Sequence, residues 1–337
     1  MTIQMLRAIA AAAALVASVS LAHSQQTKLK FSSFEPPTAA LTARVMTPWA
    51  AEVSKESGGG LQIDMYPAGL LGRNPLQQLK LLQDGVADIA WIVLGYTPGR
   101  FDDSDVVGLP FSSENAMEAS VVLTRLFARH EFSGFDDLKV LALAATPPVK
   151  VHSTSPIFAP TDMKGKRVRA TGDILVKAVT KLGGVPVTLG GGQVAESLSR
   201  GVIEATLNNW GFVADFKVNE VTSNHLNVPF GNVGVMIAMQ KAKFDALPAA
   251  TKELIEKNSG EVLSRRLAKV FDDIETEYAD RISKSGRNTV VSPSGAELSA
   301  WKTALDPVIQ EWRAATPKNE KIYQSFSAEL AKYRAGQ

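Results

Sequence analysis

Three cations stand within four positions in the segment 165–172, which reads GKRVRATG. The segment opens at a turn glycine and then alternates like a strand, so successive side chains point to opposite faces. On this pattern Arg167 and Arg169 share one face, while Lys166 and Val168 share the other. Because the strand begins at the turn, we expect Arg167 near the surface and Arg169 near the carboxyl end.

The place of Arg169 matters because ligands of open α/β sheets collect outside the carboxyl ends of the strands. An arginine held there presents a planar fork of N–H donors to a bidentate acid. The same side chain could instead form an internal ion pair with an Asp or Glu of the protein. The spacing alone favours neither role over the other.

The sequence displays no assembled catalytic set. The chain has no Cys, and after His23 it has only His130, His152 and His225. It contains no H-E-x-x-H, G-x-S-x-G or paired-His motif, so it lacks the usual signatures of zinc enzymes and serine hydrolases. We therefore expect no catalytic residues, no metal site and no cofactor, and we interpret each lone histidine as a polar or core residue.

The first 24 residues have the pattern of a secretory signal peptide. Arg7 precedes the apolar run 8–21, and Ala22 and Ser24 fit a cleavage site directly after Ser24. The run is too short for a membrane span, which needs about 20 residues. Without Arg7, the 36 Lys and Arg become 35 against 34 Asp and Glu, which gives no indication of nucleic-acid binding. The sequence predicts an exported, soluble protein, and the lack of cysteine excludes a lipid-modified tether.

Strand and helix signals alternate from Lys28 onward, an order typical of a mostly parallel sheet. Expected strands cover 28–34, 61–67, 86–94, 165–170, 185–189 and 202–210, and expected helices cover 42–60, 74–85, 172–184 and 192–201. The segments LLQDGVADIAWI and LSRGVIEATLNNW resemble each other, which suggests two similar domains. From Leu263 to Ile282 apolar residues recur at steps of three and four, which predicts a long helix with one buried stripe.

The chain after the signal peptide resembles the extracytoplasmic solute-binding proteins of TRAP transporters, a family first described for dicarboxylate uptake. The resemblance is carried, in order, by KLKFSSFEPP, YPAGLLG, LLQDGVADIAW, GYTPGRFDDSDVVGLPF, APTDMKGKRVRATG, LGGVPVTL and AESLSRGVIEATLNNW. It implies a two-domain, periplasmic-binding-protein-like α/β fold with a ligand cleft between the domains and a long domain-spanning C-terminal helix. Domain I would comprise 25–146 plus 234–272, and domain II would comprise 147–233 plus 273–337.

The resemblance also implies roles for particular residues. Arg169 matches the arginine that clamps a ligand carboxylate, and Asn208 matches the asparagine that completes the clamp. The family often has a second cation shortly upstream, where this sequence offers Lys150 or His152 in place of the usual arginine. Trp210 belongs to a pair of residues that replaces the family's expected proline.

Aromatic residues stand at or just after the expected strand ends, and they indicate the kind of ligand. They are Phe34, Trp91, Tyr96, Trp210 and Phe212. Their presence favours a flat or apolar acid over a polyhydroxylated one. We therefore expect a periplasmic protein that captures a small organic acid, of aromatic or keto type, and delivers it to the membrane permease of a TRAP transporter.

Two other functions are also compatible with the sequence. The protein could serve an ATP-driven importer or a sensor instead, and neighbouring genes for one small and one large membrane subunit would favour the TRAP system. It could also be an exported enzyme that acts on a carboxylic acid, in which case incubation with candidate acids would yield a product.

Overall fold

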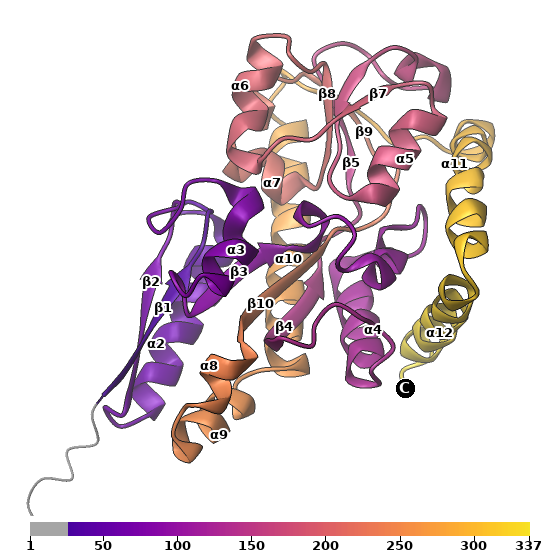
Figure 1. Cartoon of the computed structure of the whole chain (residues 1–337). Coiled ribbons are helices and arrows are strands. Elements are labelled where there is room, and N and C mark those ends of the chain that lie inside the picture. Colours follow the sequence, from indigo (N-terminus) through magenta and orange to yellow (C-terminus); the bar gives the residue numbers. More distant parts are fainter. Residues whose placement is uncertain (1–25) are drawn as a thin grey trace, which may run out of the picture.

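The computed structural model describes residues 26–337, which form two β-sheets surrounded by helices (Figure 1). The predicted signal peptide, residues 1–24, lies outside the described residues. The expected α/β class with two sheet-containing halves is confirmed. Within the described part of the chain, no helix combines the length and the apolar character that crossing a bilayer requires.

The first sheet has five strands in the order β2-β1-β3-β10-β4. Their bounds are β1 Thr27–Ser32, β2 Leu61–Tyr66, β3 Ile89–Val93, β4 Leu138–Ala145 and β10 Gly234–Gln240. β1 is parallel to both β2 and β3, but β10 is antiparallel to β3 and β4. The prediction of a mostly parallel sheet is confirmed, with β10 as the antiparallel exception, because this strand returns from the second sheet and therefore enters the first one from the opposite end.

The second sheet has six strands in the order β11-β9-β5-β8-β6-β7. Their bounds are β5 Lys150–Ser153, β6 Arg167–Arg169, β7 Val185–Val187, β8 Ala205–Asn208, β9 Asn224–Leu226 and β11 Thr289–Val291. β6 lies between β7 and β8 and is parallel to both. β5 is antiparallel to β8 and β9, since it arrives directly from the first sheet.

Helices cover both sheets, and most are short. The α-helices are α2 Thr47–Glu56, α3 Gln78–Gln83, α4 Ala116–Ala128, α5 Asp173–Lys181, α6 Val194–Ser199, α7 Trp210–Asp215, α8 Lys241–Asp245, α9 Ala249–Lys257, α10 Glu261–Ser283, α11 Gly295–Ala315 and α12 Pro317–Arg334. Short segments of other helix types are η1 Thr42–Met46, η2 Pro75–Gln77, η3 Leu94–Tyr96, η4 Asp102–Gly108, η5 Pro160–Met163, η6 Gly191–Gln193 and η7 Val218–Glu220.

The long helix α10 runs along both halves of the molecule (Figure 1). It packs against α4 and β4 beside the first sheet and against α7 beside the second. The predicted apolar stripe is confirmed, because Leu267, Phe271, Ile274 and Tyr278 are all buried. Besides this helix, the chain crosses between the sheets after β4 and again between β9 and β10.

The C-terminal helices contact both halves. α11 packs on α5 beside the second sheet, whereas α12 packs on α4 beside the first. Buried Glu329 of α12 accepts hydrogen bonds from Arg125 and Arg129, and Arg334 binds Glu118 of α4. The expected division assigned all of 273–337 to domain II, but the structure places α12 against elements of domain I.

Candidate functional site

A pocket lies between the two sheets and is bounded by α10. Its empty volume is about 660 Å³, including the part that is open to solvent. The lining residues are Phe34, Glu35, Leu41, Trp91, Val93, Tyr96, Thr146, Val149, Arg169, Thr171, Asn208, Asn209, Gly211, Phe212, Asp215, Phe216, Val233, Val235, Phe271 and Ile274. Ligand-binding clefts commonly have this mostly apolar, partly aromatic lining.

Arg169 enters the pocket from the end of β6 and is only 2% exposed. Its guanidinium donates to the Leu189 carbonyl from Nε and Nη2, both at 3.2 Å. Nη1 donates to Asn208 Oδ1 at 3.0 Å, and Nη2 donates to the Tyr96 hydroxyl at 3.0 Å. All three acceptors are neutral oxygens, so they fix the plane of the guanidinium without cancelling its charge.

The described part of the chain provides no Asp or Glu as an ion-pair partner for Arg169. The other two cations of the segment behave differently. Lys166 and Arg167 both pair with Glu204, at 3.4 Å each, and Arg167 also donates to the carbonyls of the loop before β8. Arg167 is exposed, which confirms its expected place near the surface. The interpretation of Arg169 as half of an internal ion pair is excluded within residues 26–337.

Donors remain beside Arg169 for an anionic group. A guanidinium has five N–H groups, and the observed bonds use four, which leaves one on Nη1. The Tyr96 hydroxyl accepts from Arg169 and keeps its own proton to donate. The Asn208 amide donates one N–H to Thr206 Oγ1 at 2.6 Å, and its second N–H remains available. A carboxylate in the pocket could therefore receive hydrogen bonds from three different side chains.

Aromatic rings form much of the remaining wall. Phe34 and Tyr96 face each other at a ring-centroid distance of 6.3 Å. Phe212 stacks on Phe216 at 4.5 Å, and the guanidinium carbon of Arg169 lies 5.5 Å from the Phe212 ring centroid. The structure thus brings Phe34, Trp91, Tyr96, Arg169 and Asn208 to one pocket, with Phe212 beside them.

Two acidic residues of the pocket were missed by the sequence analysis. Glu35 Oε1 accepts from Trp91 Nε1 at 3.1 Å, and Glu35 Oε2 is hydrogen-bonded to Thr42 Oγ1 at 3.3 Å. Burial, followed by the nearby charge of Asp215, raises the pKa of Glu35 to about 8. Burial also raises the pKa of Asp215. The available signal for Glu35 was its place just beyond the first strand, where Phe34 was already singled out.

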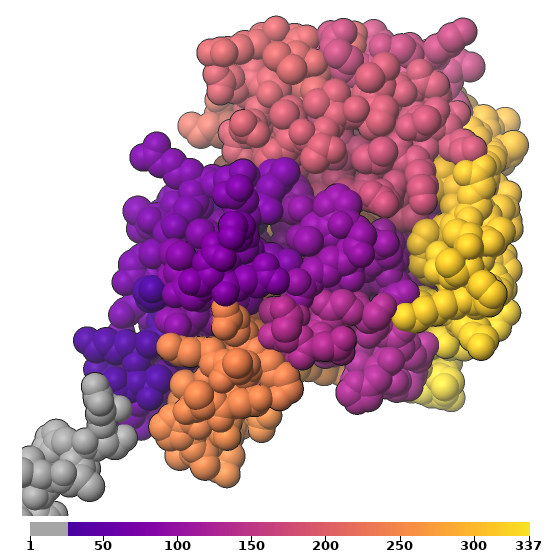
Figure 2. All heavy atoms as spheres, in the orientation of Figure 1, coloured from indigo at the N-terminus to yellow at the C-terminus, as the bar shows by residue number. Residues whose placement is uncertain are grey.

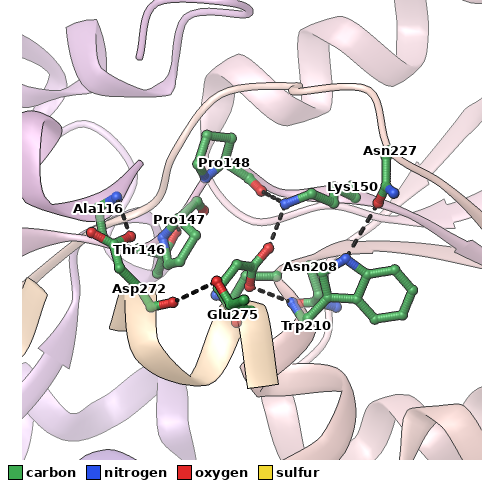
Figure 3. A network of polar contacts seen from close by, with 12 residues as sticks. Ala116, Thr146, Pro147, Pro148, Lys150, Asn208, Trp210, Asn227, Asp272 and Glu275 are labelled. Atoms are coloured by element: carbon green, nitrogen blue, oxygen red, sulfur yellow. Dashed lines mark hydrogen bonds and ion pairs between the residues drawn. The ribbon is translucent and has the colours of Figure 1, made fainter. Parts of the chain in front are cut away.

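The predicted second cation, Lys150, does not line the pocket. Its Nζ pairs with the Glu275 carboxylate and donates to the Pro148 carbonyl at 3.0 Å (Figure 3). The other carboxylate oxygen of Glu275 accepts from the backbone N–H of Trp210 at 2.8 Å. Glu275 of α10 therefore neutralises the positive charge of Lys150, and we do not assign Lys150 a role in ligand binding.

His152 and Trp210 also lie outside the pocket lining, in the core behind it. His152 Nε2 is 3.0 Å from the Asn208 carbonyl oxygen and its Nδ1 is 2.8 Å from His225 Nδ1. The Trp210 ring packs edge-on to His152 at 4.8 Å, with its Nε1 bonded to Asn227 Oδ1 at 3.3 Å. Burial, with His225 as the next cause, holds the pKa of His152 well below its ordinary value. Both residues support the segment that carries Asn208.

Among residues 26–337, no cluster of three or more His, Cys, Asp and Glu side chains is arranged to hold a metal ion.

Comparisons with known proteins agree with this geometry. The family described as bacterial extracellular solute-binding protein, family 7, matches residues 31–315. The outer membrane transporter protein TsaT of Comamonas testosteroni is 27% identical over 308 residues, which cover 89% of this chain and 90% of that protein.

Two similar crystal structures are of TRAP solute-binding proteins with bound acids. One, from a marine metagenome and specific for aromatic acid ligands, holds metahydroxyphenylacetate; it has a TM-score of 0.85 and 30% identity, and covers 91% of this chain and 99% of that one. The other, from Rhodoferax ferrireducens T118, holds copurified benzoate; it has a TM-score of 0.86 and 29% identity, and covers 92% of this chain and 99% of that one. The predicted resemblance to TRAP solute-binding proteins is confirmed, and the chain belongs to the bacterial extracellular solute-binding proteins of family 7.

Proposed function

We propose that this protein captures an aromatic or similarly flat, apolar monocarboxylate outside the cytoplasmic membrane and delivers it to a TRAP-type permease. The observation that carries the proposal is the buried guanidinium of Arg169, held by neutral oxygens in a pocket with aromatic walls. The ligand carboxylate would supply the missing negative charge. Its ring would fill the space beside Phe34, Tyr96 and Phe212.

The energetics favour such a clamp. A hydrogen bond to a charged group contributes about 1.5–3 kcal/mol, and removal of one member of a buried ion pair costs about 3–5 kcal/mol. Each 1.4 kcal/mol corresponds to a factor of about ten in affinity. Loss of the guanidinium should therefore weaken carboxylate binding by about two orders of magnitude or more.

The relatives support the aromatic character of the ligand. The marine metagenome protein is specific for aromatic acid ligands, and the Rhodoferax ferrireducens protein was found with benzoate. Binding in a closing cleft would involve bending at the crossings 146–149 and 227–233 and in α10 near Phe271. One moving domain would be 25–146 plus 234–272, joined by α12, and the other would be 147–233 plus the rest of 273–337.

Calorimetry on the mature protein tests the proposal. Benzoate should bind, whereas D-glucuronate and succinate should bind at least tenfold more weakly, because the walls offer few partners for hydroxyl groups or for a second carboxylate. Arg169→Lys should weaken benzoate binding by roughly 100-fold, since the three N–H donors of an ammonium cannot replace both the four bonds to the protein and the N–H left for the ligand.

Arg167→Lys is the matched control, because it makes the same change two residues away on the exposed end of the strand. It should leave the benzoate affinity as it is in the wild type. Strong sugar-acid binding, or full benzoate affinity in Arg169→Lys, would refute the proposal. Incubation of benzoate with the protein should yield no product, whereas turnover would favour an exported enzyme.

A further inference from the structure

Glu35 is a polar group of the pocket that carboxylate binding by Arg169 leaves unused. It follows β1 and lines the pocket together with Trp91 and Arg169. Its hydrogen bonds to Trp91 and Thr42 involve neutral groups, and the described part of the chain gives it no cationic partner. Glu35 and Arg169 form no ion pair with each other, so each of them can contact a different group of a ligand.

The proton on Glu35 can be placed from its partners. With a pKa of about 8, the carboxyl is mostly protonated at neutral pH. The indole N–H of Trp91 can only donate, so Oε1 is an acceptor and the proton belongs on Oε2. Thr42 Oγ1 is hydrogen-bonded to the same Oε2, and either hydroxyl can be the donor of this bond. Oε1 retains a second lone pair after it has accepted from Trp91.

We propose that Glu35 determines specificity by accepting, at Oε1, a hydrogen bond from a hydroxyl group of the bound acid. The preferred ligands are then hydroxylated aromatic monocarboxylates, with the carboxylate at Arg169 and the phenol at Glu35. This inference rests on the proposed function and adds the second polar contact to it.

The same side of the pocket disfavours a second anion. Glu35 lies close enough to Asp215 for the charge of Asp215 to raise the Glu35 pKa. Asp215 is itself hydrogen-bonded to the Ala40 N–H at 3.1 Å and to the Tyr278 hydroxyl at 3.4 Å. A second carboxylate of a ligand would be placed beside two acids, whereas an uncharged hydroxyl could donate a hydrogen bond to the unused lone pair of Glu35 Oε1. Dicarboxylates should therefore bind more weakly than hydroxylated monocarboxylates of the same size.

Calorimetry at pH 6.5 with benzoate, 3-hydroxybenzoate, 4-hydroxybenzoate and terephthalate tests the inference. In the wild type, at least one hydroxybenzoate should bind three- to tenfold tighter than benzoate, and terephthalate should bind more weakly than benzoate. The ratio of the benzoate Kd to the hydroxybenzoate Kd is the readout, because a general loss of affinity cancels in it.

Two variants separate hydrogen bonding from shape. Glu35→Gln keeps an acceptor for Trp91 and the ligand and a donor for Thr42, so the ratio should stay at its wild-type value. Glu35→Leu removes the acceptor, so the ratio should fall to about one, with thermal unfolding used to verify that the variant is folded. The wild-type ratio needs no variant and tests the inference by itself.

The outcomes separate this inference from the proposed function. Benzoate binding with no gain from a hydroxyl group, or a preserved ratio in Glu35→Leu, overturns the role of Glu35 and leaves the carboxylate site intact. Failure of all four acids to bind the wild type overturns both.

Discussion

A buried cation without an acidic partner is costly, and Arg169 is such a cation within the described residues. Its hydrogen bonds to Leu189, Asn208 and Tyr96 reduce the cost of desolvation and hold the guanidinium in one orientation. Preorganisation of this kind lowers the entropy that a ligand loses on binding. The residue is therefore arranged for binding at some expense of stability.

The raised pKa of Glu35 predicts a pH dependence of stability. The folded-state value of about 8 lies above the ordinary 4.5, so between these values the folded state holds a proton that the unfolded state has released. The contribution of Glu35 to stability is therefore fully present below about pH 4.5 and declines as the pH rises to 8. At about 1.4 kcal/mol per pKa unit, the effect is on the order of a few kcal/mol.

Denaturant unfolding of the wild type and Glu35→Gln at pH 5 and pH 8 measures this contribution. Relative to the wild type, Glu35→Gln should gain a few kcal/mol in free energy of unfolding between pH 5 and pH 8, because the amide does not titrate. Other titrating groups cancel in the comparison. Parallel pH curves for the two proteins would contradict the assignment.

The sequence was sufficient to distinguish Arg169 from Arg167, because their positions along one strand decide which cation reaches the carboxyl end. The sequence could not show that Lys150 is neutralised by the protein. Its partner Glu275 is 125 residues away and becomes its neighbour only when α10 packs along the second sheet. Glu35 was missed for a related reason: its contacts with Trp91 and Asp215 arise from tertiary packing, and no local pattern encodes them.

The element that connects the two halves most directly is α10. Asp272 accepts hydrogen bonds from the first N–H groups of α4, at Ala116 (2.7 Å) and Met117 (2.9 Å). One turn further, Glu275 binds Lys150 and Trp210 of the second half (Figure 3). Asp272 and Glu275 thus connect α10 to both halves of the molecule through hydrogen bonds and an ion pair.

Glu275→Gln should destabilise the protein measurably. The amide keeps an acceptor for the Trp210 N–H but leaves the largely buried ammonium of Lys150 without a counter-charge. We expect a loss of about 1–2 kcal/mol in the free energy of unfolding, measured with urea.

Glu277→Gln is the matched control on the same helix. Glu277 pairs with Arg44 at 3.3 Å, but both side chains are about half exposed. Exposed pairs contribute between 0 and about 1 kcal/mol, so this variant should resemble the wild type. Equal effects of the two substitutions would show that Glu275 has no special role.

The strand and helix pattern of the sequence predicted about half of the strands and α-helices of the described residues, among them β1, β2, β3 and α10, because their apolar periods are local. The directions of β5 and β10 could not be predicted in the same way, since a strand has the same alternation whichever way it runs. The docking of α12 on α4 depends on the Arg125–Glu329 and Arg334–Glu118 contacts, which join residues more than 200 positions apart. Such contacts follow from the assembled fold.

The two halves of the molecule meet closely beside the pocket. Figure 2 shows them in contact along their visible boundary. Gly95 follows β3 of the first sheet, and Gly172 follows β6 of the second. A Cβ atom at Gly95 would lie 2.9 Å from the Gly172 Cα, so any side chain there would push the backbones apart.

Gly95→Val should therefore hinder closure. We expect benzoate to bind at least tenfold more weakly and small-angle scattering to show a larger radius of gyration in the presence of ligand than for the liganded wild type. Gly192→Ala is the control, because a Cβ at Gly192 meets no atom within 4 Å. Unchanged affinity in Gly95→Val would show that closure at this contact is not needed for binding.

The most direct test of the central claim is the benzoate Kd of Asn208→Asp, measured by calorimetry beside the wild type. This nearly isosteric change gives Arg169 an internal carboxylate at the position where Asn208 Oδ1 now accepts at 3.0 Å. The guanidinium would then be neutralised before any ligand arrives. We expect a loss of affinity of roughly 100-fold together with a melting temperature at least equal to that of the wild type. Wild-type affinity in Asn208→Asp would contradict the role of Arg169 as the carboxylate-binding group.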